Sequence, residues 1–266
     1  MVRIAIGLVG LVMLASCAST PQISPAARSD LSPTGTLRVG INYGNEILAR
    51  RVPESGELRG VHVDLAGELG RQAGVPVELV GYAAAGKMVD GLTAGVLDVA
   101  FLAADPARAS EISYTASYLE IEATYLVPAD SSLRNVADVD REGVRIAVPA
   151  KSAYDLLLSR SLKRAQLMRA SSTPAAFDLF VAAKLEAVVG LRPRLVVEAE
   201  KLPGSRVLDG HIETIQQAIG SPKGRDAGAR YLREFIESAK ASGLVARVIE
   251  NNGVRGVSIT PKARVP

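Results

Sequence analysis

The sequence predicts an α/β protein made of two similar halves, each a mostly parallel sheet flanked by helices. Short runs rich in β-branched residues alternate with stretches whose apolar residues recur at helical spacing. This alternation begins near Thr36 and starts again near Glu122, with no short-period repeat. Alternating strands and helices are typical of βαβ units around a parallel sheet, and the restart indicates two such units.

The first half opens with a predicted strand at 36–41, TLRVGI. The helix expected over 61–74 has its apolar residues at helical spacing and ends in Gly74, a residue that favours helix termination. Three further elements complete this half: a strand at 75–81, a helix around 89–94 and a strand at 96–102.

The second half repeats the pattern. Pro174 follows Ser and Thr residues that can cap a helix, and proline is common at the first helical position, so a helix is expected to begin there. The other expected elements are strands at 122–128, 145–150, 166–171 and 185–191, a helix at 152–162, and two closing helices at 225–242 and 244–251.

Composition limits the class of protein. The 266 residues are 48% hydrophobic and 22% charged, which excludes a disordered chain and is enough for a sizeable core. The 31 basic and 28 acidic residues give a net charge of +3, and no basic stretch carries interleaved aromatic residues. We therefore expect no nucleic-acid partner.

Residues that carry chemistry are sparse. The chain has one Cys and two His, and His62 and His211 stand far apart, so we expect no metal site and no cofactor. No GxSxG, HExxH or GxGxxG motif occurs. The segment GYAAAGKM (81–88) resembles a phosphate-binding loop until Met88, which replaces the hydroxyl residue that would hold Mg²⁺. The sequence therefore predicts a binding protein and not an enzyme.

The N-terminus predicts export. Arg3 precedes an apolar run too short to span a membrane comfortably, which is typical of a secretory signal over residues 1–16. The stretch from Leu14 to Cys17 resembles the lipobox of bacterial lipoproteins, in which the Cys is lipidated. The alternative is an ordinary signal cleaved near Ala18. We expect a periplasmic lipoprotein that touches the membrane only through this anchor.

Five segments occur in a specific order between Thr36 and Ser258. They are GTLRVGI, GVHVDLAGELGRQAGVPVELVGY, LTAGVLDVAF, DPARASEISYTASYLE and KLEAVVGL. Together they resemble the bacterial extracellular solute-binding proteins of the amino-acid type (family 3), which serve ABC importers. The resemblance implies a type II periplasmic-binding-protein fold, with two α/β lobes that two crossing strands join and that close on a ligand. It also implies a monomer that delivers its ligand to an ABC permease in the inner membrane.

The resemblance also implies a domain organisation. A Ser- and Pro-rich tether at 17–35 would precede the folded body, and the two crossings would fall near Val127 and Ala218. The expected parts of the body are lobe 1 at 36–127 and 217–258, lobe 2 at 128–216, and a tail at 259–266.

The matched motifs imply ligand-binding residues at the cleft between the lobes. The guanidinium of Arg108 would form a bidentate pair with a ligand carboxylate, unless it is an ordinary surface arginine. Asp105 precedes Pro106 and is expected to cap a short helix, with a possible ligand contact. Ser152 opens a lobe 2 helix as a cap or a carboxylate contact. The remaining expected contacts in these segments are Ala103 and Lys151.

Departures from the family pattern at Leu191 and in the opening loop bear on the ligand. Leu191 stands where amino-acid binders commonly carry an Asp that pairs with the ligand's ammonium group, and leucine cannot replace that partner. Arg192 and Arg194 follow it and either face the cleft mouth or begin a solvated helix. Tyr43 is the nearest aromatic residue to the missing aromatic segment of the opening loop, with packing as its alternative role.

These residues together predict capture of a small organic anion that carries a carboxylate and is not a standard α-amino acid. Three alternatives stay open. The chain could bind an amino acid with Asp105 holding the ammonium group. It could be a dehydratase-like enzyme with Asp105 or Glu46 as general acid, because a fold does not fix function. It could also be a sensory subunit that presents its closed form to a receptor.

Overall fold

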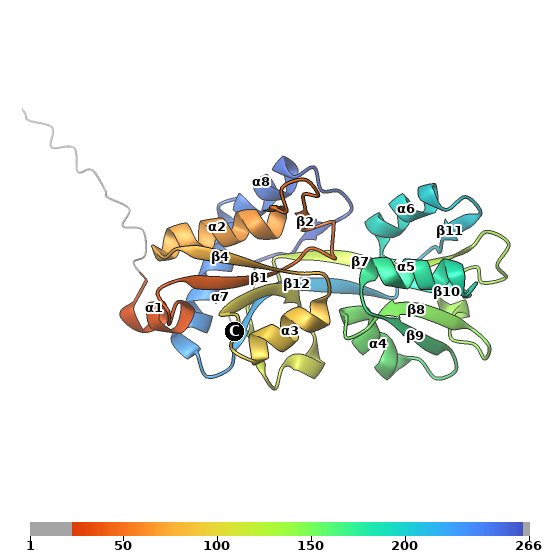
Figure 1. The fold of residues 1–266 in the computed structure, drawn as a ribbon, viewed down its shortest axis with the longest axis horizontal. Helices are drawn as coiled ribbons and strands as arrows, with labels where there is room; N and C mark the ends of the chain where they lie inside the picture. The colour runs from red at the N-terminus through yellow and green to blue at the C-terminus, as the bar shows by residue number, and fades with distance from the viewer. Residues whose placement is uncertain (1–22, 263–266) are drawn as a thin grey trace, which may run out of the picture.

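The structure is a computed structural model that describes residues 23–262, and it consists of two α/β lobes side by side (Figure 1). One mixed sheet runs through both lobes in the order β4-β1-β5-β12-β7-β10-β8-β9. Helices cover both faces of the sheet in each lobe. The predicted α/β class is therefore confirmed. The expected signal peptide at 1–16 and the lipidation site Cys17 lie outside the described residues.

Lobe 1 is built on three parallel strands, with β1 in the centre. These strands are β1 (Leu37–Asn42), β4 (Val77–Tyr82) and β5 (Val99–Ala103). The connections between them are α2 (Val61–Ala73) and α3 (Ala85–Thr93), which belong to different buried clusters. As predicted, α2 ends at Gly74, whose φ of 62° is the left-handed conformation that glycine adopts without strain.

Lobe 2 is built on three parallel strands in the order β10-β8-β9. They are β8 (Arg145–Pro149), β9 (Gln166–Ala170) and β10 (Ala187–Leu191), with α4 (Ala153–Ser161), α5 (Thr173–Ala182) and α6 (Arg192–Lys201) packed around them. Outside these two groups of parallel strands, the chain also contains several short elements and two helices near its C-terminal end. They are β2 (Arg50–Arg51), β3 (Leu58–Arg59), β6 (Ile112–Tyr114), the 3₁₀ helices η1 (Pro106–Arg108) and η2 (Val136–Asp138), α7 (Asp226–Ala241) and α8 (Leu244–Asn251).

Two long antiparallel strands join the lobes, β7 (Leu119–Pro128) and β12 (Glu213–Pro222). They pair with each other over 119–123 and 213–217. Beyond this overlap β7 pairs with β10 in lobe 2, and β12 pairs with β5 in lobe 1. The expected crossing near Val127 is wrong, because β7 continues unbroken into lobe 2, where Val127 is buried and pairs with β11 (Ser205–Val207).

Both predicted ends of the folded body need correction. The expected tail at 259–266 begins inside β13 (Ser258–Ile259), which pairs with β7 beside its overlap with β12. The expected tether at 17–35 contains α1 (Pro25–Leu31), capped by the Ser24 hydroxyl. The α1 helix buries Leu31 in the main lobe 1 core, close to α7. A helix of seven residues has too short an apolar pattern to be predicted from a Ser- and Pro-rich sequence.

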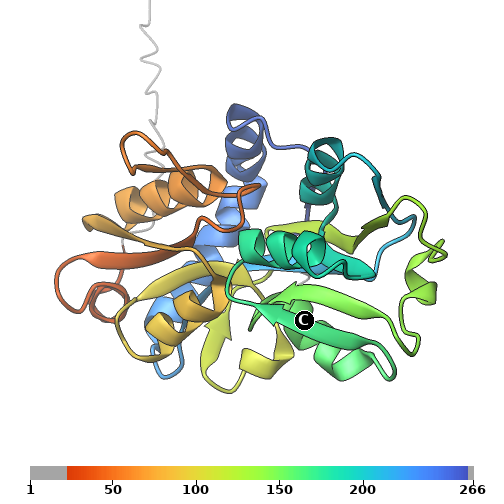
Figure 2. The same cartoon turned by 45° about the vertical axis from the view of Figure 1, so that its right-hand side comes forward.

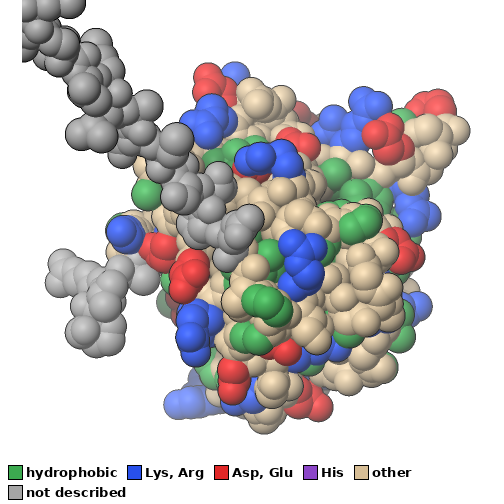
Figure 3. All heavy atoms as spheres, turned by 90° about the vertical axis from the view of Figure 1, so that its left-hand side faces the viewer, with side chains coloured by type: hydrophobic (Ala, Val, Ile, Leu, Met, Phe, Trp, Pro, Cys, Tyr) green, Lys and Arg blue, Asp and Glu red, His purple; other side chains and the backbone are tan. Residues whose placement is uncertain are grey.

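The surface carries both signs of charge. On the face at the lobe 1 end, basic and acidic side chains lie interspersed (Figure 3). Within residues 23–262, no helix combines the length and the apolar character that crossing a membrane requires.

The docking of α1 gives a testable prediction. Leu31 is 1% exposed, so Leu31→Ala removes buried apolar volume and is expected to lower the free energy of unfolding by about 2–5 kcal/mol. Denaturant titration measures this change. The exposed Ser29 on the same helix is the control, and Ser29→Ala is expected to change stability by less than about 0.5 kcal/mol. Equal effects of the two substitutions would contradict the docking of α1.

Candidate functional site

A cavity lies between the lobes, at the carboxyl ends of four parallel strands. Asn42 ends β1, Ala103 ends β5, Pro149 ends β8 and Leu191 ends β10, and all four residues line it. The space open to water inside is only about 60 Å³, because the lobes are closed on each other. The loop before α4 lies directly against α3 of the opposite lobe (Figure 2), where Gly86 has no room for a side chain beside Lys151.

The polar side chains of the cavity come from both lobes and from a crossing strand. They are Asn42, Asn45, Glu46, His62, Arg108, Ser152, Thr173, Arg194 and Gln217. Apolar side chains fill the remaining wall, chiefly Met88, Phe101, Tyr154, Phe177, Leu191 and Ile215. In the part of the chain that the structure describes, no group of three or more His, Cys, Asp or Glu side chains is arranged to hold a metal ion.

Arg108 projects into this cavity from the end of η1, directly after β5. Its side chain is buried, and it donates hydrogen bonds to the carbonyl oxygens of Ala103 at 3.3 Å and Lys151 at 2.7 Å. Lys151 belongs to lobe 2, so this arginine links the lobes. Among residues 23–262 no carboxylate is paired with it. A buried guanidinium held only by neutral carbonyl groups keeps its charge available for an anion.

The two predicted helix caps are present, but only one of them reaches the cavity. Ser152 caps α4 by accepting a hydrogen bond from the Asp155 amide at 3.2 Å, and it lines the cavity. Asp105 caps η1 through the Ala107 amide at 2.8 Å. Its second oxygen accepts from Arg160 of lobe 2 at 3.0 Å, and Asp105 does not line the cavity. Its carboxylate therefore joins the two lobes outside the cavity.

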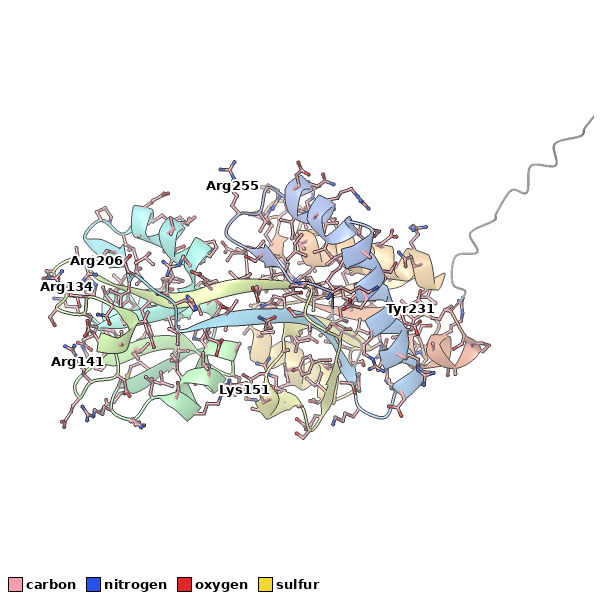
Figure 4. All side chains as sticks on the ribbon, turned by 180° about the vertical axis from the view of Figure 1, so that it is seen from behind. Arg134, Arg141, Lys151, Arg206, Tyr231 and Arg255 are labelled. Carbon is pink, nitrogen blue, oxygen red and sulfur yellow. The ribbon has the colours of Figure 1, made fainter. Side chains whose placement is uncertain are left out.

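The side chains of three residues expected at the ligand contact other partners and do not line the cavity. The Lys151 ammonium pairs with Asp90 of α3 at 3.0 Å and lies at the boundary between the lobes (Figure 4). The Tyr43 ring stacks under the Arg51 guanidinium, 4.4 Å from the ring centre. The Arg192 side chain pairs with Glu122 of β7 and does not line the cavity.

The outward direction of Arg192 has a simple cause. Its Nε donates to Glu122 of β7 at 2.7 Å, and its other nitrogens donate to backbone carbonyl groups, including that of Gly210. It is the first residue of α6, and residues two positions apart on a helix project in nearly opposite directions. Arg194, two positions later, therefore points into the cavity.

Three contacts hold Arg194 in place. One nitrogen donates to the Glu198 carboxylate at 2.7 Å, a second forms an ion pair with Glu46 of lobe 1, and the guanidinium lies 5.7 Å from the centre of the Phe177 ring. Its Nε is buried without a hydrogen-bond partner. The sequence did not separate Arg194 from Arg192, and the helical spacing of the two arginines was the signal that could have separated them.

Leu191 confirms that this part of the cavity is apolar. Its side chain is buried, lines the cavity and packs with the main lobe 1 cluster, although it comes from lobe 2. A carboxylate is therefore absent from the end of β10, and a ligand that meets this wall meets hydrocarbon.

His62 is a cavity residue that sequence reasoning set aside. It stacks on Phe101 with ring centres 5.3 Å apart, and both of its ring nitrogens are buried without a hydrogen-bond partner. Burial lowers its pKa to about 3 from 6.5. The imidazole is therefore neutral at physiological pH.

The stability of the protein should respond to pH through His62. Since its folded pKa of about 3 lies below the unfolded value of 6.5, acidification protonates the unfolded state first, and stability falls as the pH drops below 6.5. We expect His62→Phe to reduce the fall in melting temperature between pH 7 and 5. Identical pH profiles for wild type and His62→Phe would refute a buried neutral imidazole.

Solved structures with the same architecture exist at low sequence identity. A mutant of ArgBP from T. maritima is 21% identical with a TM-score of 0.74, over 86% of this chain and 100% of that one. The arginine-bound protein AbpA from Streptococcus pneumoniae is 16% identical with a TM-score of 0.72, over 84% of this chain and 96% of that one.

A third similar structure is the ancestral amino-acid-binding protein AncCDT-1, described as a precursor of cyclohexadienyl dehydratase. It is 21% identical with a TM-score of 0.71, over 85% of this chain and 98% of that one. These likenesses confirm the type II periplasmic-binding-protein fold. None of the curated protein sequences matches the chain significantly. The model of the bacterial extracellular solute-binding proteins, family 3, matches residues 37–253, and the chain belongs to that family.

Proposed function

We propose that this solute-binding protein captures an amino acid in the cavity between its lobes and delivers it to an ABC importer. The observation that carries the proposal is Arg108, a buried guanidinium inside the cavity whose hydrogen-bond partners are neutral carbonyl groups. Such a group suits the α-carboxylate of an amino acid, because a guanidinium binds a carboxylate through two parallel hydrogen bonds. The similar structures that are named as amino-acid binders support the same class of ligand.

Closure of the lobes would complete the site. Arg108 comes from lobe 1, whereas Ser152 and Thr173 come from the N-terminal ends of α4 and α5 in lobe 2. A carboxylate between them would meet a guanidinium from one side and hydroxyl groups from the other. Binding energy would then favour the closed form over the open one, as ligand-induced population shift requires.

A second candidate is a carboxylate that lacks the amino group. The buried Leu191 favours it, because an ammonium group gains nothing from a hydrocarbon wall. The sequence alone placed this candidate first, and it also gains support because Asp105, the acid then considered as an ammonium partner, does not line the cavity. The amino-acid binders among the similar structures favour the amino acid instead.

Three further expectations remain proposals. A dehydratase-like activity would need a general acid in the cavity. His62, with its pKa of about 3, is uncharged at neutral pH, and of the two acids expected for this role only Glu46 lines the cavity. Lipidation of Cys17 would hold the protein at the outer face of the membrane, beside its importer. A sensory role would use the same closed form.

Calorimetric titration tests the ligand class. The twenty amino acids and matched acids without the amino group are the probes. We expect Arg108→Ala to weaken binding of the best ligand by about 100-fold or more, because a charge-assisted bond contributes about 1.5–3 kcal/mol and two are lost. Arg192→Ala is the matched control, since this arginine faces Glu122 outside the cavity, and it should leave affinity unchanged. Equal affinity of wild type and Arg108→Ala would refute the proposed anchor.

A further inference from the structure

We infer that Glu46 supplies the negative charge that neutralises the ligand's ammonium group, an inference that rests on the proposed capture of an amino acid. An ammonium group enclosed between two lobes loses water and needs an acceptor of opposite charge. Glu46 is the one acidic residue among those that line the cavity. The Leu191 side chain, at the end of β10, has no atom that accepts a hydrogen bond.

The position of Glu46 suits this role. It lies in the turn after β1, where the Leu48 and Ala49 amides both donate to the Asn45 carbonyl at 3.0 Å and fix the backbone. Its side chain is 51% exposed, which places the carboxylate at the rim of the cavity. Within residues 23–262 its one hydrogen bond comes from Arg194 and uses a single oxygen, Oε2. A carboxylate accepts several hydrogen bonds, so Oε1 can receive an N–H from the ligand.

Arg194 acts as a positioning residue for Glu46. Glu198 and the Phe177 ring hold the guanidinium from within lobe 2, and its side chain is only 18% exposed. When the lobes close, this fixed cation meets the carboxylate from lobe 1 and directs it over the cavity. Recognition of the ammonium group therefore belongs to the closed form, whereas Arg108 belongs to lobe 1 and is available before closure.

The other lobe 1 acids that face lobe 2 do not compete for this role. Asp105 pairs with Arg160, and Asp90 pairs with Lys151, and neither acid lines the cavity. Asp90 therefore offers a matched control. Its substitution by Asn also removes one ion pair between the lobes, with the same polarity as the Glu46–Arg194 pair, but it leaves the charge of the cavity unchanged.

The test compares each amino acid with its counterpart that lacks the amino group. Glutamine with glutaramic acid and arginine with 5-guanidinopentanoic acid are two such pairs, and calorimetry gives the dissociation constants. For Glu46→Gln we expect at least a 10-fold loss of affinity for the amino acid and less than a 3-fold change for its counterpart, since a hydrogen bond to a charged group is worth about ten-fold or more. For Asp90→Asn we expect both affinities to change by the same factor.

The outcomes distinguish a failure of the role of Glu46 from a failure of the proposed function. Equal weakening of both members of a pair in Glu46→Gln would show that Glu46 acts only through lobe closure and would overturn its proposed role. Unchanged amino-acid affinity in Glu46→Gln would overturn it as well, while the proposed function would stand. If wild-type protein binds no amino acid, the proposed function itself fails, and the role of Glu46 fails with it. Melting curves of the ligand-free variants check that each one is folded.

Discussion

The cavity depends on the antiparallel pairing of β7 with β12. This backbone ladder of residues 119–123 with 213–217 is the segment where the chain passes between lobes, and each strand then continues into a different lobe. β13 adds a third strand beside residues 119–120. The lobe 1 end of the crossing is therefore braced on both sides of β7, and bending should concentrate in the residues that follow, where β7 has lost β13.

The crossing brings the carboxyl ends of four parallel strands to one place. The surfaces of the two lobes that face each other there carry charges of opposite sign. Every ion pair that connects them in the described chain takes its acid from lobe 1 and its base from lobe 2: Glu46 with Arg194, Asp90 with Lys151, and Asp105 with Arg160. The exposed Asp90–Lys151 pair contributes about 1 kcal/mol at most. The sorting nevertheless gives the closed form an attraction that salt weakens.

Local signals in the sequence predicted local structure well. The helix stop at Gly74 and the caps at Ser152 and Asp105 depend on backbone geometry within a few residues, and all three occur. The directions of Tyr43 and Arg192 were not predictable in the same way. Each lies at or just beyond the end of a strand, where turn geometry and a distant partner decide which way the side chain projects.

The same limit applies to the acid that the proposed function requires. Leu191 was interpreted as the loss of an acidic residue. A closed cavity that holds an ammonium group needs a nearby negative charge, but that charge can come from another position in the chain. Glu46 lies 145 positions earlier in the chain and on the other lobe, so only the fold brings the two residues to one cavity. The order of residues in the sequence therefore does not reveal that Glu46 could supply the charge missing at Leu191.

The pairing of Glu46 with Arg194 also sets how strongly the site can discriminate. A site whose buried polar group is left unpaired by the wrong ligand rejects that ligand by a factor of about 10⁴ or more. Here an acid without an amino group leaves Glu46 still bonded to Arg194 at an exposed rim, so no charge is left unpaired. Selectivity for the amino group should therefore reflect one additional charged hydrogen bond, on the order of ten-fold to a hundred-fold. A cavity in which Glu46 has the proposed role would prefer amino acids while still admitting the carboxylates that resemble them.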